Sequence, residues 1–173
     1  FLEIFNEASR RGEIALAVSP DANRWQYQGV VLREPFHLSY PQVFEWNGVY
    51  YMLPETRAAS AVRLYRATRF PDEWTFACEL LRGPFADSTL VFQDGLWWLF
   101  AYQRDNSLSL YYAPEPIGSW TLHPSSPIVT RSRTASRPAG RIVRFRGSLL
   151  RYAQDETSGY GGALRAIQID EMT

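Results

Sequence analysis

The sequence has 173 residues, of which 46% are hydrophobic and 15% are aromatic, so it is long and apolar enough for one packed domain. The 18 basic and 18 acidic residues balance, which gives no support for binding to nucleic acid or to a charged membrane surface. A single cysteine, Cys78, excludes an internal disulfide and a cysteine-rich zinc site, and no apolar run is long enough for a transmembrane helix. The single cysteine and the lack of a visible signal peptide favour a cytoplasmic location.

The first part of the chain predicts three short strands, over residues 1–5, 13–19 and 25–29. The next part predicts four, over residues 41–46, 49–54, 62–67 and 74–80. Asn47-Gly48 joins the first two of these four, and this dipeptide is typical of the type I′ turn of a β-hairpin. The first group therefore corresponds to strands two to four of the second group.

The same four-strand pattern returns over residues 88–93, 96–101, 108–113 and 120–122, with Asp94-Gly95 at its hairpin turn. A last group covers residues 140–145, 148–153 and 163–169, with Arg146-Gly147 at the turn and no room for a fourth strand. Gly48, Gly95 and Gly147 thus recur at a spacing of roughly 50 residues, which is in the range of repeat architectures.

Tryptophans open the fourth strands with the same period, at Trp25, Trp74 and Trp120. Four strands per repeat at this spacing are typical of propeller blades, and we expect these tryptophans to pack adjacent blades together. The prediction is an all-β fold, a β-propeller of the five-bladed type with about four blades, whose end blades are incomplete. Residues 1–173 would form a single propeller domain that is a fragment of a larger propeller. A β-sandwich with coincidental spacing is the alternative.

Polar residues stand at matched positions in the repeats. Seven residues after each turn glycine lie Glu55, Tyr102 and Gln154, and eight residues before two of these glycines lie Tyr40 and Asp87. Corresponding positions of propeller blades converge on one central channel. The sequence therefore predicts a ring of polar side chains at one end of the blades, made of Glu3, Tyr40, Glu55, Asp87, Tyr102, Arg137 and Gln154.

This mixture of carboxylates, a guanidinium, an amide and phenols suits a polyol, because it offers paired hydrogen bonds and aromatic faces for sugar C–H groups. Asp87 and Glu55 could serve as a catalytic carboxylate pair in glycoside hydrolysis. The alternative is structural: Glu55 and Arg137 could form a buried ion pair that holds blades together. His37 could face a ligand, although a lone histidine is more often structural, and two isolated histidines disfavour a metal site.

Several motifs together resemble the N-terminal propeller domain of glucosamine inositolphosphorylceramide transferase-like proteins, over nearly the whole chain. They are Phe36-His37-Leu38-Ser39-Tyr40-Pro41, Met52-Leu53-Pro54-Glu55-Thr56, Leu64-Tyr65-Arg66-Ala67, Asp87-Ser88-Thr89, Arg137-Pro138-Ala139-Gly140-Arg141, Ala153-Gln154-Asp155 and Tyr160-Gly161-Gly162. The resemblance implies a five-bladed propeller akin to the arabinanase, levansucrase and invertase superfamily. It also adds His37 and Asp155 to the expected substrate-binding residues.

The family's transferase chemistry belongs to a separate C-terminal domain, so the resemblance does not assign that activity to these residues. The hydrolytic superfamily carries acids at several blade openings, whereas Tyr40 stands where one of its aspartates is expected. We therefore expect a carbohydrate-associated propeller that binds or positions a glycan, with a covalently linked transferase domain as its partner and no cofactor or metal. The alternatives are a furanosidase-like hydrolase that uses Asp87 and Glu55, and a platform for protein interaction.

Overall fold

The computed structural model describes every residue of the chain, Phe1–Thr173, and 57% of them lie in β-strands. The helical content is one short 3-10 segment, η1 (Arg57–Ala59). The chain forms two compact units, Phe1–Pro84 and Phe85–Thr173. The prediction of an all-β chain is therefore confirmed.

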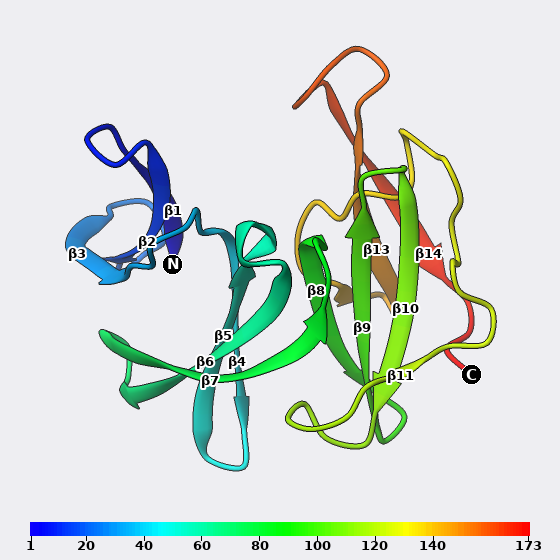
Figure 1. Cartoon of the computed structure of the whole chain (residues 1–173), viewed down its shortest axis with the longest axis horizontal. Coiled ribbons are helices and arrows are strands. Elements are labelled where there is room, and N and C mark those ends of the chain that lie inside the picture. The colour runs from blue at the N-terminus through cyan, green and yellow to red at the C-terminus, as the bar shows by residue number, and fades with distance from the viewer. The chain divides into compact units, whose positions relative to one another are not determined.

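The first unit contains two antiparallel sheets in which each strand pairs with its neighbour along the chain (Figure 1). The three-stranded sheet consists of β1 (Leu2–Asn6), β2 (Arg11–Val18) and β3 (Gln26–Leu32). The four-stranded sheet consists of β4 (Ser39–Trp46), β5 (Val49–Glu55), β6 (Ala61–Arg69) and β7 (Glu73–Arg82). Consecutive residues are buried along β2 and β5, so both faces of these inner strands are covered.

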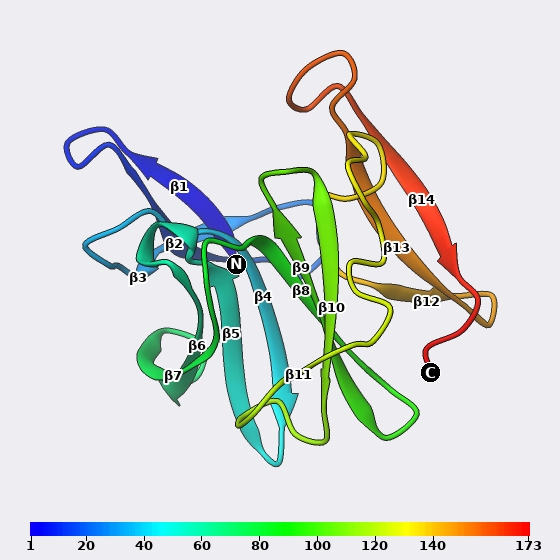
Figure 2. The same cartoon turned by 45° about the vertical axis from the view of Figure 1, so that its right-hand side comes forward.

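The second unit repeats this construction, and Figure 2 shows its strands most clearly. Its four-stranded sheet consists of β8 (Ala86–Gln93), β9 (Leu96–Gln103), β10 (Ser107–Ala113) and β11 (Thr121–Leu122). Its three-stranded sheet consists of β12 (Val143–Phe145), β13 (Ser148–Asp155) and β14 (Ala163–Ile169). All strand pairs are antiparallel, so the up-and-down order within each predicted blade is confirmed.

The three predicted hairpin turns are confirmed. Trp46 pairs with Val49, Gln93 with Leu96 and Phe145 with Ser148, so each turn has two central residues. Both central residues have positive φ in every case, at 50° and 76°, 52° and 81°, and 49° and 85°. This backbone matches the right-handed twist of the paired strands, which is why Asn-Gly and Asp-Gly predict it so well.

Each unit has its own apolar core. In the first unit the core is a cluster of buried residues from both sheets and from the segment between them: Ile14, Leu32, Leu38, Met52 and Tyr65. In the second unit the core is built on a cluster of Ala86, Trp98, Phe100, Tyr102, Leu108 and Leu110. Complete burial of one such aliphatic or aromatic side chain stabilises the fold by about 1.5–3 kcal/mol.

The predicted packing role of the tryptophans is wrong for Trp25, which is 63% exposed. Its indole N–H donates to the carbonyl of Ala22 at 3.1 Å, and Trp74 makes the matching bond to Pro71 at 2.8 Å. Trp74 also packs against the first unit's core and lies 5.6 Å from the ring of Phe1. Both tryptophans therefore close the turn before an outer strand with an indole hydrogen bond, and only Trp74 also packs against the core.

Candidate functional site

Polar residues that the repeats predict to be equivalent do occupy equivalent places in their sheets. Glu55 ends β5, while Tyr102 and Gln154 are the next-to-last residues of β9 and β13. Tyr40 and Asp87 are both the second residue of the first strand of a four-stranded sheet.

Tyr40 and Asp87 share an unusual backbone conformation. Their φ angles are 49° and 46°, in the left-handed region that few residues other than glycine, asparagine and aspartate adopt. In both sheets the strand pairing shifts at this point, between Ser39 and Gln42 and between Ala86 and Thr89. A bulge of this kind redirects a side chain and is common next to functional sites.

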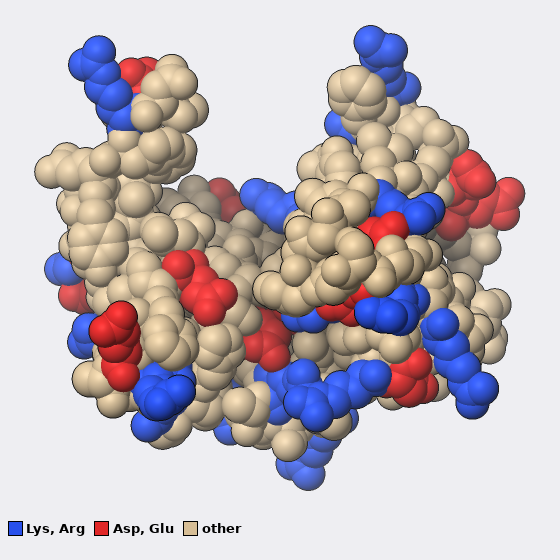
Figure 3. Space-filling view, turned by 90° about the horizontal axis from the view of Figure 1, so that it is seen from above, with Lys and Arg blue, Asp and Glu red and all other residues tan.

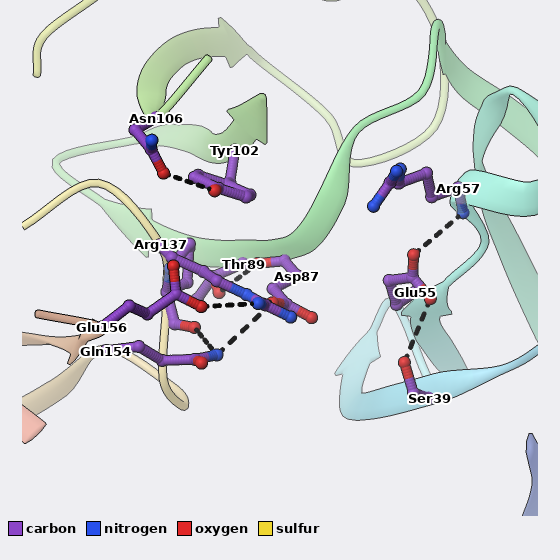
Figure 4. Close-up of polar contacts among 11 residues, drawn as sticks. Ser39, Glu55, Arg57, Asp87, Thr89, Tyr102, Asn106, Arg137, Gln154 and Glu156 are labelled. Atoms are coloured by element: carbon purple, nitrogen blue, oxygen red, sulfur yellow. Dashed lines mark hydrogen bonds and ion pairs between the residues drawn. The ribbon is translucent and has the colours of Figure 1, made fainter. Parts of the chain in front are cut away.

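In the second unit, Asp87 forms an ion pair with Arg137, which comes from the segment before β12 (Figure 4). Arg137 Nε donates to Asp87 Oδ2 at 2.6 Å, and Arg137 Nη1 donates to Glu156 Oε1 at 2.8 Å. The side chains are 7% exposed for Asp87, 24% for Arg137 and 16% for Glu156. One guanidinium therefore bridges two carboxylates in a largely buried setting.

The charges of this bridge depend on one another. Burial raises the pKa of Asp87, and the Arg137 guanidinium opposes that rise. Burial alone would lower the pKa of Arg137, but the carboxylates of Asp87 and Glu156 raise it above its ordinary value. Arg137 is consequently a permanent cation that is held in place from two sides.

Gln154 and Tyr102 complete the group around Asp87. Gln154 Nε2 donates to the carbonyl of Pro138 at 3.1 Å and to Asp87 Oδ2 at 3.5 Å. The Tyr102 ring lies 5.7 Å from Arg137 Cζ, and its hydroxyl donates to Asn106 Oδ1 at 2.9 Å. The structure thus brings four predicted site residues together, each from a different strand or connecting segment.

Two further residues lie at this site: Glu156 was not predicted, and Tyr160 was named only within the motif Tyr160-Gly161-Gly162, with no role at the site. Glu156 binds Arg137, and Tyr160 places its ring 5.2 Å from Arg137 Cζ although it is 80% exposed. Both lie in the loop between β13 and β14. The repeat places site residues only at fixed distances from the turn glycines, and neither of these residues stands at such a distance. The available signal was local: Glu156 follows Gln154 and Asp155 directly, at the end of a strand that already carried a site residue.

Asp155 serves the fold rather than the cluster. Its Oδ1 accepts from Thr157 Oγ1 at 2.6 Å and from the Thr157 backbone N–H at 3.1 Å. Its Oδ2 accepts from Arg165 Nε at 2.9 Å. These bonds, those from Thr157 foremost, lower the pKa of Asp155 to about 2, so its carboxylate is engaged in fastening the loop to β14.

In the first unit, Glu55 accepts hydrogen bonds from Ser39 Oγ at 3.0 Å and from the backbone N–H of Arg57 at 3.3 Å (Figure 4). Glu3 and His37 form a second pair, with 3.6 Å between Glu3 Oε1 and His37 Nε2. Asp87 and Glu55 belong to different units, so their use as one catalytic pair remains a prediction.

His37 has a defined hydrogen-bonding role. Its Nδ1 accepts from the Gly12 backbone N–H at 2.8 Å, so in the neutral ring the proton lies on Nε2, towards Glu3. Gly12 must be a glycine here, because a Cβ would lie 2.2 Å from the Leu38 carbonyl oxygen and 2.7 Å from His37 Cε1. Glu3 and His37 are both 40% exposed, and no group of three or more His, Cys, Asp or Glu side chains is arranged to hold a metal ion.

The surface carries charges of both signs. All 18 basic residues are arginines, and on the face shown in Figure 3 they alternate with acidic side chains in small groups. None of the helical structure is long and apolar enough to cross a bilayer.

The four antiparallel sheets, two of four strands and two of three, are the blades of a β-propeller of the five-bladed type, here with about four blades. The model of one family, described as glucosamine inositolphosphorylceramide transferase 1, N-terminal, matches residues 1–173. The chain belongs to this family.

Curated relatives support the assignment. The chain is 38% identical over 182 residues to glucosamine inositolphosphorylceramide transferase 1 of Oryza sativa subsp. japonica, and 34% identical over 182 residues to that of Arabidopsis thaliana. Each match covers 100% of this chain and 24% of the relative. The chain thus spans about a quarter of the length of these relatives.

Solved structures share the fold at low sequence identity. A thermostable family-43 glycoside hydrolase superimposes with a TM-score of 0.71 at 12% identity, over 96% of this chain and 65% of the hydrolase. Zg3597, a family 117 glycoside hydrolase from Zobellia galactanivorans, gives a TM-score of 0.66 at 17% identity, over 90% of this chain and 55% of Zg3597. At these identities the likeness establishes the fold alone.

Proposed function

We propose that residues 1–173 belong to one propeller domain that binds a glycan and positions it for a covalently linked glycosyltransferase domain. The observation that carries the proposal is the cluster around Arg137. A half-buried guanidinium, two carboxylates and an amide meet beside aromatic rings, and this combination of fixed polar groups with aromatic faces is typical of sugar sites. Family membership supports the link to a transferase.

Binding demands less of this cluster than catalysis does. Arg137 occupies one carboxylate oxygen of Asp87 at 2.6 Å, which favours a fixed structural anion over a group that exchanges protons with substrate. Gln154 offers an amide that can reorient towards a hydroxyl group. We therefore assign binding to Arg137 and Gln154, with Asp87 as the residue that positions Arg137 and Tyr102 as a buried ring beside it.

The test is ligand-observed saturation-transfer NMR on the whole chain, with glucosamine, N-acetylglucosamine, myo-inositol and arabinose as probes. We expect weak binding, in the millimolar range that suits a shallow polar site with few contacts. Gln154→Ala and Asp87→Ala should weaken it several-fold, whereas Tyr27→Ala, an exposed tyrosine of β3, should not. Absence of binding by the wild-type chain to every probe would disprove the proposal.

The second candidate is a furanosidase-like hydrolase that uses Asp87 and Glu55. The burial that raises the pKa of Asp87 favours this candidate, because a raised pKa suits a general acid. Tyr40 argues against it, since a neutral phenol is a poor base near pH 7. We expect no release of sugar from arabinan, fructan or aryl-furanosides. Turnover that disappears in both Asp87→Ala and Glu55→Ala would establish hydrolysis instead.

A further inference from the structure

The loop between β13 and β14 presents Tyr160 to solvent beside Arg137 of the cluster. Tyr160 is 80% exposed, yet its ring lies 5.2 Å from Arg137 Cζ. The buried ring of Tyr102 lies 5.7 Å from the same carbon atom. Arg137 therefore contacts two aromatic rings, one that belongs to the core and one that is free to meet a ligand.

The base of this loop is fixed. Asp155 binds Thr157 and Arg165, and Glu156 binds Arg137 at 2.8 Å. Arg133 adds a bond from its Nη2 to the carbonyl of Glu156. These contacts hold the two ends of the loop at the sheet.

The tip of the loop is a turn flanked by glycines, in which the Gly162 N–H donates to the Gly159 carbonyl at 3.2 Å. Gly159 and Gly161 flank Tyr160 with φ angles of 115° and 74°, conformations that glycine adopts without steric cost. No atom lies within 4 Å of where a Cβ would stand on either glycine. The exposed Tyr160 side chain can rotate away from Arg137 while this turn and the base of the loop remain in place.

Arg137 keeps hydrogen-bonding capacity for a ligand. A guanidinium has five N–H groups, and the bonds to Asp87 and Glu156 use Nε and Nη1. Nη2 makes no hydrogen bond to the protein, and it carries two donors in a fixed plane. Each of these donors can bond one hydroxyl oxygen of a sugar, because a hydroxyl group accepts as well as donates.

The charge of the cluster selects among ligands. Asp87 and Glu156 outnumber Arg137 by one negative charge, and Arg133 at the Glu156 carbonyl brings the total to zero. A net charge of −1 or of zero does not attract an anionic ligand, although the Arg137 guanidinium by itself would. A neutral ligand avoids the cost of moving a charged group out of water, so the cluster favours a neutral ligand over a charged one.

We propose that Tyr160 and Arg137 form a subsite for a neutral pyranose ring that inserts between them. The C–H face of the sugar would stack on Tyr160, and its hydroxyl groups would accept hydrogen bonds from Arg137 Nη2. This inference rests on the proposed glycan-binding function and adds to it a movable aromatic residue and the charge class of the ligand.

The experiment compares methyl glycosides of glucose, galactose and mannose with glucuronate and glucosamine, by saturation-transfer NMR on the whole chain. We expect the neutral glycosides to bind at least as well as the charged sugars. Loss of the aromatic face in Tyr160→Ala should weaken binding of a neutral glycoside roughly two- to tenfold. Tyr160→Phe restores the face and should recover most of this loss, and Tyr27→Ala is the control at an exposed tyrosine outside the site.

The outcomes separate the two proposals. Wild-type affinity in Tyr160→Ala, together with weakened binding in Gln154→Ala, would disprove the subsite and leave the glycan-binding function intact. Preferential binding of glucuronate would disprove the charge argument and hence the subsite as proposed. No binding of any sugar by the wild-type chain would disprove both proposals. A Tyr160→Phe variant as weak as Tyr160→Ala would show that the hydroxyl, not the stacking face, makes the contact.

Discussion

Replacement of Arg137 by methionine tests the energetic role of the carboxylate bridge. Methionine keeps most of the aliphatic volume but removes the guanidinium, so Asp87 would be left buried without its cation. Removal of one partner from a fully buried ion pair costs about 3–5 kcal/mol. Because the Arg137 side chain is 24% exposed, water compensates for part of this loss, and we expect the free energy of unfolding to fall by about 2–3 kcal/mol.

The loss should depend on pH in a defined direction. Burial raises the pKa of Asp87 above its unfolded value, and removal of Arg137 takes away the charge that opposes this rise. A carboxyl whose pKa is higher in the folded state stabilises the fold in its protonated form, so stability is lost as pH rises through the folded pKa. The deficit of Arg137→Met should therefore be smallest near pH 4 and grow towards pH 7.

Urea unfolding followed by tryptophan fluorescence measures this effect at several pH values. Asp87→Asn is the matched second variant, because asparagine keeps both the shape and the tolerance for the left-handed backbone at this position. The double variant should be more stable than the sum of the single losses predicts, with an interaction energy of about 2 kcal/mol. An interaction energy below about 0.5 kcal/mol, or a deficit that does not change with pH, would refute the reasoning.

Three further changes test the fold around the site. Gly12→Ala should destabilise the first unit by more than about 2 kcal/mol in urea unfolding, because the new methyl group would collide with the Leu38 carbonyl, which cannot rotate away. Thr56→Val keeps the volume of a buried side chain but removes a donor to a backbone carbonyl at 2.7 Å and an acceptor for the Arg63 N–H at 3.0 Å. It should cost about 2–3 kcal/mol, and an unchanged urea midpoint would show that these bonds contribute nothing. Asp155→Asn should lower the urea midpoint at pH 6 but not near pH 2, since a carboxylate with a lowered pKa stabilises the fold only above that pKa, and an equal difference at both pH values would contradict this.

Local chemistry explains why so much of the fold was predictable. Asn47-Gly48 and Asp94-Gly95 specify two-residue turns by themselves, and the apolar runs on either side of them then set the strands. The prediction that Trp25 packs between blades is wrong because equivalent positions of a repeat need not be equally buried. The Trp25 indole instead makes a hydrogen bond that closes a turn. Glu156 and Tyr160 could not be found from the repeat, since loop residues follow no period and are positioned only by tertiary contacts.

A bulge carries Tyr40 in one sheet and Asp87 in another. It separates the chemistry of a side chain from the backbone conformation that directs it, although these two properties usually change together. The left-handed conformation recurs with an aromatic side chain and with an acidic one, so the surrounding strands hold the backbone in this shape for chemically unlike residues. A mutation at either position to a residue that tolerates a positive φ therefore changes which chemical group the strand offers, while the direction in which it is offered stays the same. During evolution, such a scaffold can acquire a new ligand preference through single substitutions, without rebuilding a blade.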